Sequence, residues 1–179
     1  MLAAAAAGGL AATPVQRRYL MYTLKAVFTP DDPRHQHLLE LADLATGNGL
    51  MDFQRPIWRD LVTQLLGSIR EPGSDRRKHL RAPLELQVDI LAPEELASLA
   101  TSSIGAGGLS IKIAEVIPVG AQLDLSIKLE RRPVPLLARA QVVWSRPGEL
   151  GVAFIDLFQN DREMLEGLAV KAVLSGSPS

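Results

Sequence analysis

The sequence predicts an α+β protein, in which a helical N-terminal region precedes a small antiparallel β-barrel with a closing helix. Apolar residues recur with the helical period up to about residue 70 and alternate with a period of two beyond it. The alternating runs are short, proline and glycine separate them, and no long helix intervenes, which is typical of a small barrel. The stretch "REPGSD" at the change of period has the composition of a linker, which we place at 71–75.

The N-terminal region, residues 13–70, carries signals for about three helices. At 13–14 and at 32–33, an N-cap residue precedes a proline in the first helical position. The second of these starts is followed by a Leu/Ala stripe that ends at Gly47, a plausible C-terminal stop. The third helix spans 56–69, where apolar residues follow the i, i+1, i+4, i+5 pattern.

The C-terminal region carries five runs with strand character and then a helical pattern. The runs are residues 84–90, 109–113, 121–129, 134–144 and 150–157. The helix starts near Asn160, and one face of it gathers Met164, Leu165, Leu168 and Val173. We therefore expect five or six strands and a terminal helix within residues 76–174.

Composition limits the classes of function. The 179 residues are 47% hydrophobic and 22% charged, so the chain can bury a core, although we expect residues 1–12 and 175–179 to be disordered. A net charge of −1 argues against binding bulk nucleic acid. The absence of cysteine excludes thiolate metal sites and disulfides and fits a reducing, cytoplasmic compartment. No apolar run is long enough for a membrane span.

A basic cluster, "RRKHLR", lies between the linker and the first alternating run. It contains an RxxxR pattern at Arg77 and Arg81, preceded by Arg76. Composition alone would assign these side chains to a solvated linker, because most charge clusters are surface. Guanidinium groups are also well suited to anionic nucleotides, because they bind phosphate oxygens in bidentate fashion and stack on flat bases.

The order of these segments resembles the PilZ domain family over roughly residues 76–173. Members of that family have an RxxxR motif, a strand, a D/N-x-S-x-x-G segment, further strands in a Greek-key-like barrel and a terminal helix. Here "RKHLR", "GGLSI", "VVW" and "LGVAFIDL" occur in that order. The resemblance implies that the chain binds cyclic di-GMP, with Arg76, Arg77 and Arg81 as ligand residues.

The second motif departs from the family pattern. With Gly108 as its glycine, Ser103 stands at the acidic position and Gly105 at the serine position. A second register, with Ser102 as the serine and Gly105 as the glycine, leaves Ala100 at the acidic position. We prefer the first register, because an alternating strand then follows directly. The alternative, purely structural interpretation of the segment is a flexible turn that leads into this strand.

The substitutions remove side-chain contacts that the resemblance implies. A carboxylate accepts two bonds from a guanine edge, whereas the Ser103 hydroxyl accepts at most one, and Gly105 contributes none. Each lost charge-assisted contact costs about 1.5–3 kcal/mol. The resemblance therefore implies that Ser103, Gly105 and Gly108 line a wall that offers the ligand fewer contacts than usual.

The leading functional hypothesis is a non-catalytic cyclic di-GMP receptor or adaptor that couples binding to its own helical region or to a protein partner. The alternative is a degenerate PilZ module that acts as a ligand-independent protein adaptor, for example in pilus or motility machinery. The helices leave room for a homodimer. We expect no enzyme activity, cofactor or metal: Ser103, His79 and Asp75 lack a nucleophile elbow, and His35 and His37 point in different directions on a helix.

Overall fold

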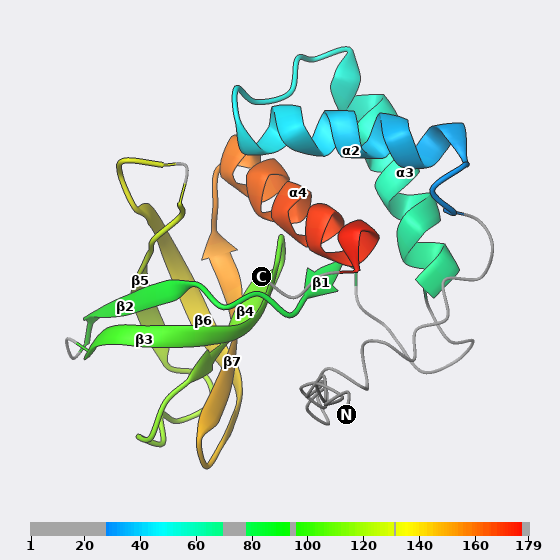
Figure 1. The fold of residues 1–179 in the computed structure, drawn as a ribbon. Helices are drawn as coiled ribbons and strands as arrows, with labels where there is room; N and C mark the ends of the chain where they lie inside the picture. Colours follow the sequence, from blue (N-terminus) through cyan, green and yellow to red (C-terminus); the bar gives the residue numbers. More distant parts are fainter. Residues whose placement is uncertain (1–27, 70–77, 94–95, 131, 177–179) are drawn as a thin grey trace, which may run out of the picture.

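The computed structural model of the chain describes residues 28–69, 78–93, 96–130 and 132–176. The helix expected after residues 13–14, the linker 71–75 and the low-complexity start lie outside these residues. The described elements form three layers (Figure 1): the barrel, then helix α4, then helices α2 and α3. Helix α4 is thus sandwiched between the barrel and the N-terminal helices.

Helix α2 spans Pro33–Thr46 and begins and ends where the sequence predicts. The side chain of Asp32 caps it by accepting a hydrogen bond from the Arg34 backbone N–H at 2.8 Å. At its other end the Gly47 N–H donates to the carbonyls of Asp43 and Leu44, at 3.0 and 3.1 Å. His35 is buried, and its Nδ1 lies 3.1 Å from the Phe28 carbonyl oxygen, which gives this histidine a structural role.

Helix α3 spans Gln54–Ile69 and begins two residues before the predicted start. Its buried residues, Trp58, Leu61, Val62, Leu65 and Leu66, repeat at the predicted spacing and confirm the apolar stripe. Arg55 fastens the first turn of α3 to α4, because its Nε donates to Glu163 Oε1 and its Nη2 to Asn160 Oδ1, both at 3.0 Å.

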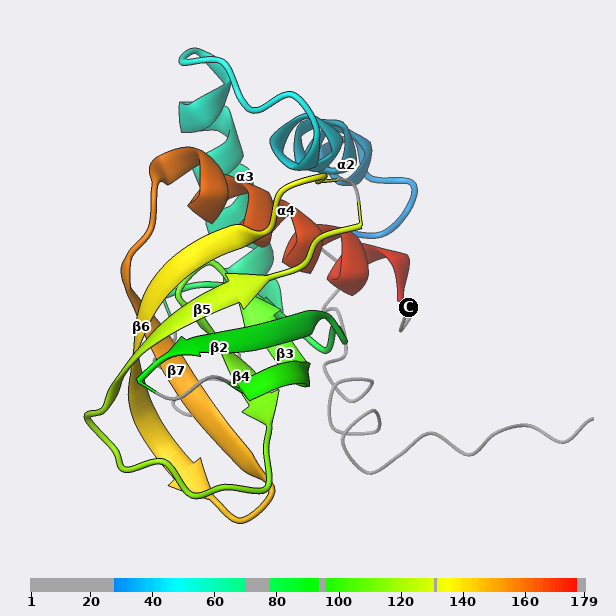
Figure 2. The ribbon, with the colours of Figure 1, turned by 90° about the vertical axis from the view of Figure 1, so that its left-hand side faces the viewer.

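The strands of the described chain form a closed antiparallel barrel (Figure 2). Around the barrel the order is β3-β2-β5-β6-β7-β4, and pairing of β4 with β3 closes it, while the short β1 pairs with β3 outside this ring. The order is Greek-key-like, as predicted, because β4 lies between β3 and β7. The strands are β1 Arg81–Ala82, β2 Gln87–Ala92, β3 Leu96–Gly105, β4 Gly108–Lys112, β5 Gln122–Ile127, β6 Leu136–Arg146 and β7 Glu149–Asp156.

Two strand predictions need correction. β2 begins at Gln87, three residues later than predicted, and β3 was not predicted. Both differences involve Thr101, whose hydroxyl accepts from the Leu86 N–H at 2.9 Å and donates to the Leu84 carbonyl at 2.6 Å. This side chain is fully buried, so a polar residue stands where apolar alternation would have indicated a strand. A register shift between Thr101 and Ser103 interrupts the pattern further.

Helix α4 spans Gln159–Ser175 and is buried on two sides, whereas the sequence indicated one apolar face. Met164 and Leu168 pack on the barrel core, while Ala169 and Val170 belong to the helical core. Gly167 permits close contact with α2, because a Cβ there would lie 3.2 Å from the Ala42 carbonyl oxygen. The helix reaches Ser175 and so extends into the range predicted as a disordered tail.

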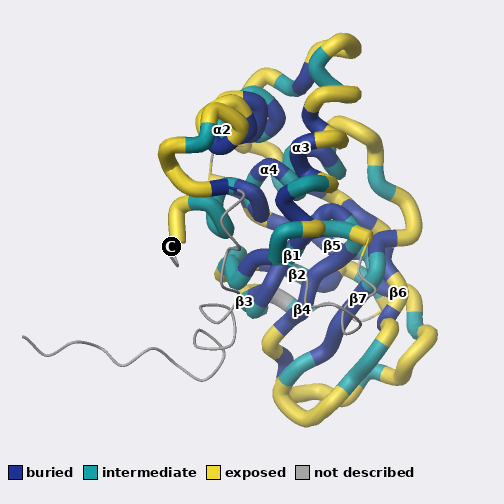
Figure 3. Tube along the Cα trace, turned by 90° about the vertical axis from the view of Figure 1, so that its right-hand side faces the viewer, coloured by how far each residue is buried: buried dark blue, intermediate teal, exposed yellow. Residues whose placement is uncertain are grey.

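The molecule contains two hydrophobic cores. The barrel core gathers residues of all six ring strands with Leu165 of α4. The helical core gathers the buried residues of α2 and α3 with Phe28, Leu50, Leu80, Ala82, Ala169 and Val170. Figure 3 shows buried stretches inside the barrel and on the helix surfaces that face α4. Leu80 and Ala82 thus connect the start of the barrel region to the helical core.

Within the described ranges, no helix combines the length and apolar character that a membrane crossing requires.

Candidate ligand-binding site

The arginine segment, defined as residues 78–82, lies between the helical core and the end of β3. Leu80 and Ala82 are fully buried in the helical core. Arg81 lies between these two residues at the start of β1, and its side chain points the opposite way, toward Gly105 of β3, while the His79 ring lies against Gly107. Arg81 is half-buried, and its Cα partner across the β1–β3 ladder is Gly105. Arg76 and Arg77 lie outside the described residues.

Gly105 lies directly beneath the arginine segment. A Cβ at this position would lie 2.1 Å from the Leu80 carbonyl oxygen and 3.0 Å from Arg81 Cγ. The first distance is far inside van der Waals contact, so the approach of β1 to β3 requires glycine here. Gly105, which the preferred register places at the serine position of the second motif, therefore lets the arginine segment dock there.

The turn that follows, at residues 106 and 107, is held from three directions. The His79 ring covers Gly107, where a Cβ would lie 2.8 Å from His79 Cδ2. The Phe154 N–H donates to the Gly107 carbonyl at 3.1 Å. From α4, Arg162 Nη1 donates to the Ala106 carbonyl at 2.9 Å. The arginine segment, β7 and α4 thus fix the position of the second motif.

Gly108 lies on the far side of this turn, against β7. A Cβ there would lie 2.0 Å from the Val152 carbonyl oxygen, and the residue has a φ of 155°. The position requires glycine for the close approach of β4 and β7. Gly105 and Gly108 both exclude a Cβ, so this packing is compatible with either register of the second motif.

Ser103 lies on the outer face of the barrel and is largely buried, at 8% exposure. Its hydroxyl donates to Ser110 Oγ on β4 at 3.2 Å. In the alternative register, the Ser102 hydroxyl donates to the carboxylate of Glu149 on β7. Both candidate serines therefore already have hydrogen-bond partners inside the protein.

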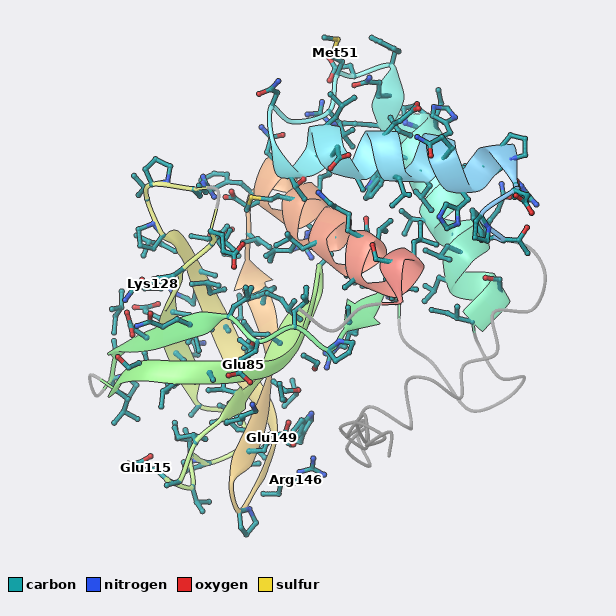
Figure 4. The ribbon with its side chains drawn as sticks, in the orientation of Figure 1. Met51, Glu85, Glu115, Lys128, Arg146 and Glu149 are labelled. Carbon is teal, nitrogen blue, oxygen red and sulfur yellow. The ribbon has the colours of Figure 1, made fainter. Side chains whose placement is uncertain are left out.

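A polar cluster that sequence reasoning missed lies next to Ser102. Arg146 forms an ion pair with Glu149, and its guanidinium carbon lies 5.1 Å from the centre of the Trp144 ring (Figure 4). Burial of Glu149 opposes ionisation, but the hydrogen bond from Ser102 and the charge of Arg146 outweigh it and lower the pKa of this carboxyl. Trp144, Arg146 and Glu149 are close in sequence around the turn between β6 and β7. Ser102 is 47 residues from Glu149, and the pairing of β4 with both β3 and β7 brings the two together.

Glu166 on α4 is a second site residue that the sequence did not reveal. Its Oε1 lies 3.6 Å from His79 Nδ1, and its Oε2 accepts a hydrogen bond from Trp58 Nε1 at 3.2 Å. A glutamate in a helix of mixed polarity gives no signal of such contacts. It joins the arginine segment to helix α3.

The structure also contains a groove of about 720 Å³ between α4, the end of α2 and residues 84–86. Its charged rim includes Lys171, Arg132 and Glu130. Neither Arg81 nor the second motif lines it, so the groove is separate from the predicted site. Over the described residues, no group of three or more His, Asp or Glu side chains is arranged to hold a metal ion.

The arrangement suits binding better than catalysis. Arg81 supplies a cation, and Gly105 and Gly107 allow the Leu80 carbonyl and the His79 ring to pack closely on the second motif. The hydroxyls of Ser102 and Ser103 donate to Glu149 and Ser110, and not to a histidine that could act as a base.

Comparison with protein families gives a match to a family model described as "PilZ domain" over residues 75–170. Among curated proteins, none matches the chain significantly.

Solved structures also match, among them the following three. The first, an inhibitor of motility from Bacillus subtilis (MotI/DgrA), is 21% identical with a TM-score of 0.48, and the match covers 55% of this chain and 51% of that one. The second, the PilZ domain of YcgR from Escherichia coli with c-di-GMP, is 11% identical with a TM-score of 0.44, and covers 55% and 92%. The third, the PilZ domain of CeSA from a cellulose-synthesizing bacterium, is 16% identical with a TM-score of 0.38, and covers 53% and 95%.

Proposed function

This chain belongs to the PilZ domain family, and we propose from this premise that it is a receptor that binds cyclic di-GMP at its arginine segment and couples binding to its helical region. PilZ domains are non-catalytic modules that bind cyclic di-GMP. The observation that carries the proposal is the packing of the arginine segment on the second motif, with Arg81 opposite Gly105 and His79 over Gly107.

The chemistry of the ligand fits the residues at this point. Cyclic di-GMP has two phosphodiesters, and guanidinium groups bind phosphate in bidentate fashion. Arg81 stands at the edge of the barrel face, and Arg76 and Arg77 precede it closely in sequence. We propose that these three arginines provide the main electrostatic contacts to the ligand.

The second motif has a reduced role in this proposal. A serine side chain at position 105 is excluded by the Leu80 carbonyl, and the Ser103 hydroxyl is bonded to Ser110. The contribution of residues 103–108 is therefore backbone shape: Gly105 and Gly108 form the wall, and Ser103 lies beside it. Binding through arginines and backbone alone predicts a weaker affinity than a complete motif would give.

The coupling to the helices follows from the two sides of the arginine segment. Arg81 faces the barrel surface, while Leu80 and Ala82 are buried in the helical core. A ligand that moves Arg81 also moves Leu80 and Ala82. Because the helical core is closely packed, it cannot absorb this movement locally, and the helices have to move with these two residues. We propose that binding shifts the helical layer between two arrangements.

Calorimetric titration with cyclic di-GMP tests the proposal. We expect a saturable isotherm for the full chain and loss of binding in the double variant Arg77→Ala/Arg81→Ala. Arg59→Ala/Arg139→Ala is the matched control, because it also removes two positive charges, from exposed positions of α3 and β6. An absence of heat at hundreds of micromolar ligand would overturn the proposal, as would equal affinity in the double variant.

A second candidate function is a ligand-independent protein adaptor. Two features favour it. Both Ser102 and Ser103 donate to protein groups, and Met51 and Phe53 expose 63% and 68% of their surface between α2 and α3. Figure 4 shows Met51 at the tip of this connection, away from the barrel. The adaptor hypothesis predicts that a protein partner is captured equally with and without cyclic di-GMP, and that Phe53→Ala reduces this capture.

The same exposed side chains are where we place the contact of a homodimer formed through the helices. Sedimentation equilibrium of the full chain and of Phe53→Ala tests this. A monomer at all concentrations would exclude the homodimer.

A further inference from the structure

The carboxylate of Glu166 lies between the arginine segment and the deepest aromatic side chain of the helical core. Its Oε1 lies 3.6 Å from His79 Nδ1, and its Oε2 accepts from Trp58 Nε1 at 3.2 Å. Trp58 is 1% exposed, and the Glu166 side chain is 14% exposed. Because this carboxylate is partly desolvated and has partners on two different elements, a movement of either partner changes its interaction with the other.

Arg162 lies one helical turn before Glu166, so both side chains project from the same face of α4. Arg162 Nη1 donates to the Ala106 carbonyl in the turn of the second motif, at 2.9 Å. Through these two residues α4 contacts both segments of the proposed binding site.

Further contacts fasten α4 to the N-terminal helices. Arg55 of α3 bonds Glu163 and Asn160, each at 3.0 Å. Lys171 Nζ lies 2.5 Å from Asp43 Oδ1 of α2, and Gly167 lies in close contact with Ala42 of the same helix. A displacement of α4 therefore has to be followed by α2 and α3.

We propose that Glu166 is a positioning residue that relays a change at the arginine segment to helix α3 through His79 and Trp58. The inference rests on the proposed function and adds the route of its coupling. When the ligand draws the arginine segment toward itself, His79 changes its distance to Glu166 Oε1. The carboxylate of Glu166 then changes its orientation, and the length of the hydrogen bond from Trp58 Nε1 to Oε2 changes as a result.

The relay is reciprocal, because coupling between two sites acts equally in both directions. Glu166→Gln and His79→Ala each interrupt it at a different residue. We therefore expect each variant to change the Kd for cyclic di-GMP by about fivefold or more, at the lower end of typical coupling factors. The double variant should change the Kd no more than one single variant does, because residues of one relay are not additive.

The test combines calorimetry with NMR of the indole N–H groups in the full chain. The sequence contains two tryptophans, and Trp144→Phe in a separate sample assigns their resonances. We expect cyclic di-GMP to shift the Trp58 indole resonance in the parent, and neither Glu166→Gln nor His79→Ala to show that shift. His37→Ala is the control, because this exposed histidine lies on α2. It should retain both the affinity and the shift.

The outcomes separate the relay from the proposed function. Calorimetric binding without a shift of Trp58 would overturn the relay and leave the function standing. A shift of normal size in His79→Ala or Glu166→Gln would also overturn the relay. An absence of calorimetric binding in the parent would overturn the proposed function, and the ligand-driven relay with it.

Discussion

The two hydrophobic cores of this protein are completed in different ways. The barrel core consists of its own strands, and only Leu165 reaches it from a helix among the fully buried members. The helical core depends on residues from outside its own region: Leu80 and Ala82 from the arginine segment, and Ala169 and Val170 from α4. The core of the barrel is thus formed almost entirely by the barrel itself, whereas the core of the helical layer includes residues of the PilZ region.

This difference is the basis of the proposed coupling between the barrel and the helices. Two of the residues that complete the helical core, Leu80 and Ala82, are adjacent in sequence to Arg81, whose Cα partner on β3 is Gly105. The segment 78–82 therefore contains both core residues of the helical layer and the arginine that we propose to contact the ligand. If the helical core depends on the barrel region in this way, the two layers unfold in one transition. Substitutions in the arginine segment should then weaken the connection between them.

The largest effect is expected from Trp58→Ala, which removes the largest fully buried side chain of the helical core. We expect a loss of about 3–5 kcal/mol in the free energy of unfolding. Because the cores share α4 and the arginine segment, the barrel should unfold in the same transition. Urea unfolding followed by circular dichroism and by amide signals from β5 and β6 measures both layers.

Phe53→Ala is the control for this substitution, because Phe53 is 68% exposed. Its change should stay within about 0.5 kcal/mol. Two separate unfolding transitions in the parent would contradict the claim that the helical core depends on the barrel region, since they would mean that the two cores unfold independently.

The second prediction concerns Leu80→Ala. Leu80 is fully buried in the helical core although it belongs to the arginine motif. We expect a loss of about 2–5 kcal/mol in the free energy of unfolding and a weaker affinity for cyclic di-GMP in the same variant. Thermal unfolding and calorimetry provide the two readings, and Leu137→Ala, at an exposed position of β6, is the control. Unchanged affinity in a folded Leu80→Ala protein would show that the core and the ligand site are not coupled.

The third prediction separates family resemblance from this structure. Gly105→Ser restores the serine of the second motif, but its Cβ would lie 2.1 Å from the Leu80 carbonyl oxygen. We expect a loss of stability of about 1–3 kcal/mol, and no gain in affinity for cyclic di-GMP. Gly67→Ser in α3, where a Cβ meets no atom within 4 Å, is the matched control. Tighter binding by Gly105→Ser would mean that the arginine segment does not dock on β3 as described.

The sequence predicted the parts of the fold that have a regular pattern. The caps of α2, the apolar stripe of α3 and four of the later strands could be read from spacing alone. β3 could not, because the buried Thr101 uses its hydroxyl to satisfy the backbone of Leu84 and Leu86. Local patterns do not reveal a polar side chain that replaces a backbone partner.

The candidate site was predictable only in its cationic part. The RxxxR pattern marked Arg81, but no sequence signal indicated that Leu80 would turn toward the helices or that Gly105 would lie beneath β1. Glu166 and Arg162 escaped notice because their partners, His79 and Ala106, are more than 50 residues away. Such contacts depend on how the layers pack.

The smallest expected effect is a pH dependence from Glu149, whose interactions lie within the barrel. The pKa of this carboxyl is lowered in the folded protein, with the Ser102 hydrogen bond and Arg146 outweighing burial. A lowered pKa contributes stability above the unfolded pKa, and this contribution is lost as pH falls through the folded pKa. We therefore expect Glu149→Gln to flatten the decline of stability below about pH 4.5, near the ordinary value for glutamate.

This pH effect also sharpens the comparison, because a barrel residue should influence the helices if the two layers form one unit. The helical signal should decline at the same acidic pH as the barrel signal in parent and variant alike. Glu85→Gln, at an exposed position, is the control. A shift in the barrel signal alone would show that the helical layer unfolds separately.

The central claim is that one segment, residues 78–82, serves both the ligand site and the helical core. Hydrogen–deuterium exchange of the full chain with and without saturating cyclic di-GMP tests it most directly. The account predicts that the ligand changes exchange in the arginine segment, in the turn at 106–107, and also in α4 around Glu166 and in α3 around Trp58. Unchanged exchange in α3 and α4 at saturating ligand would contradict it.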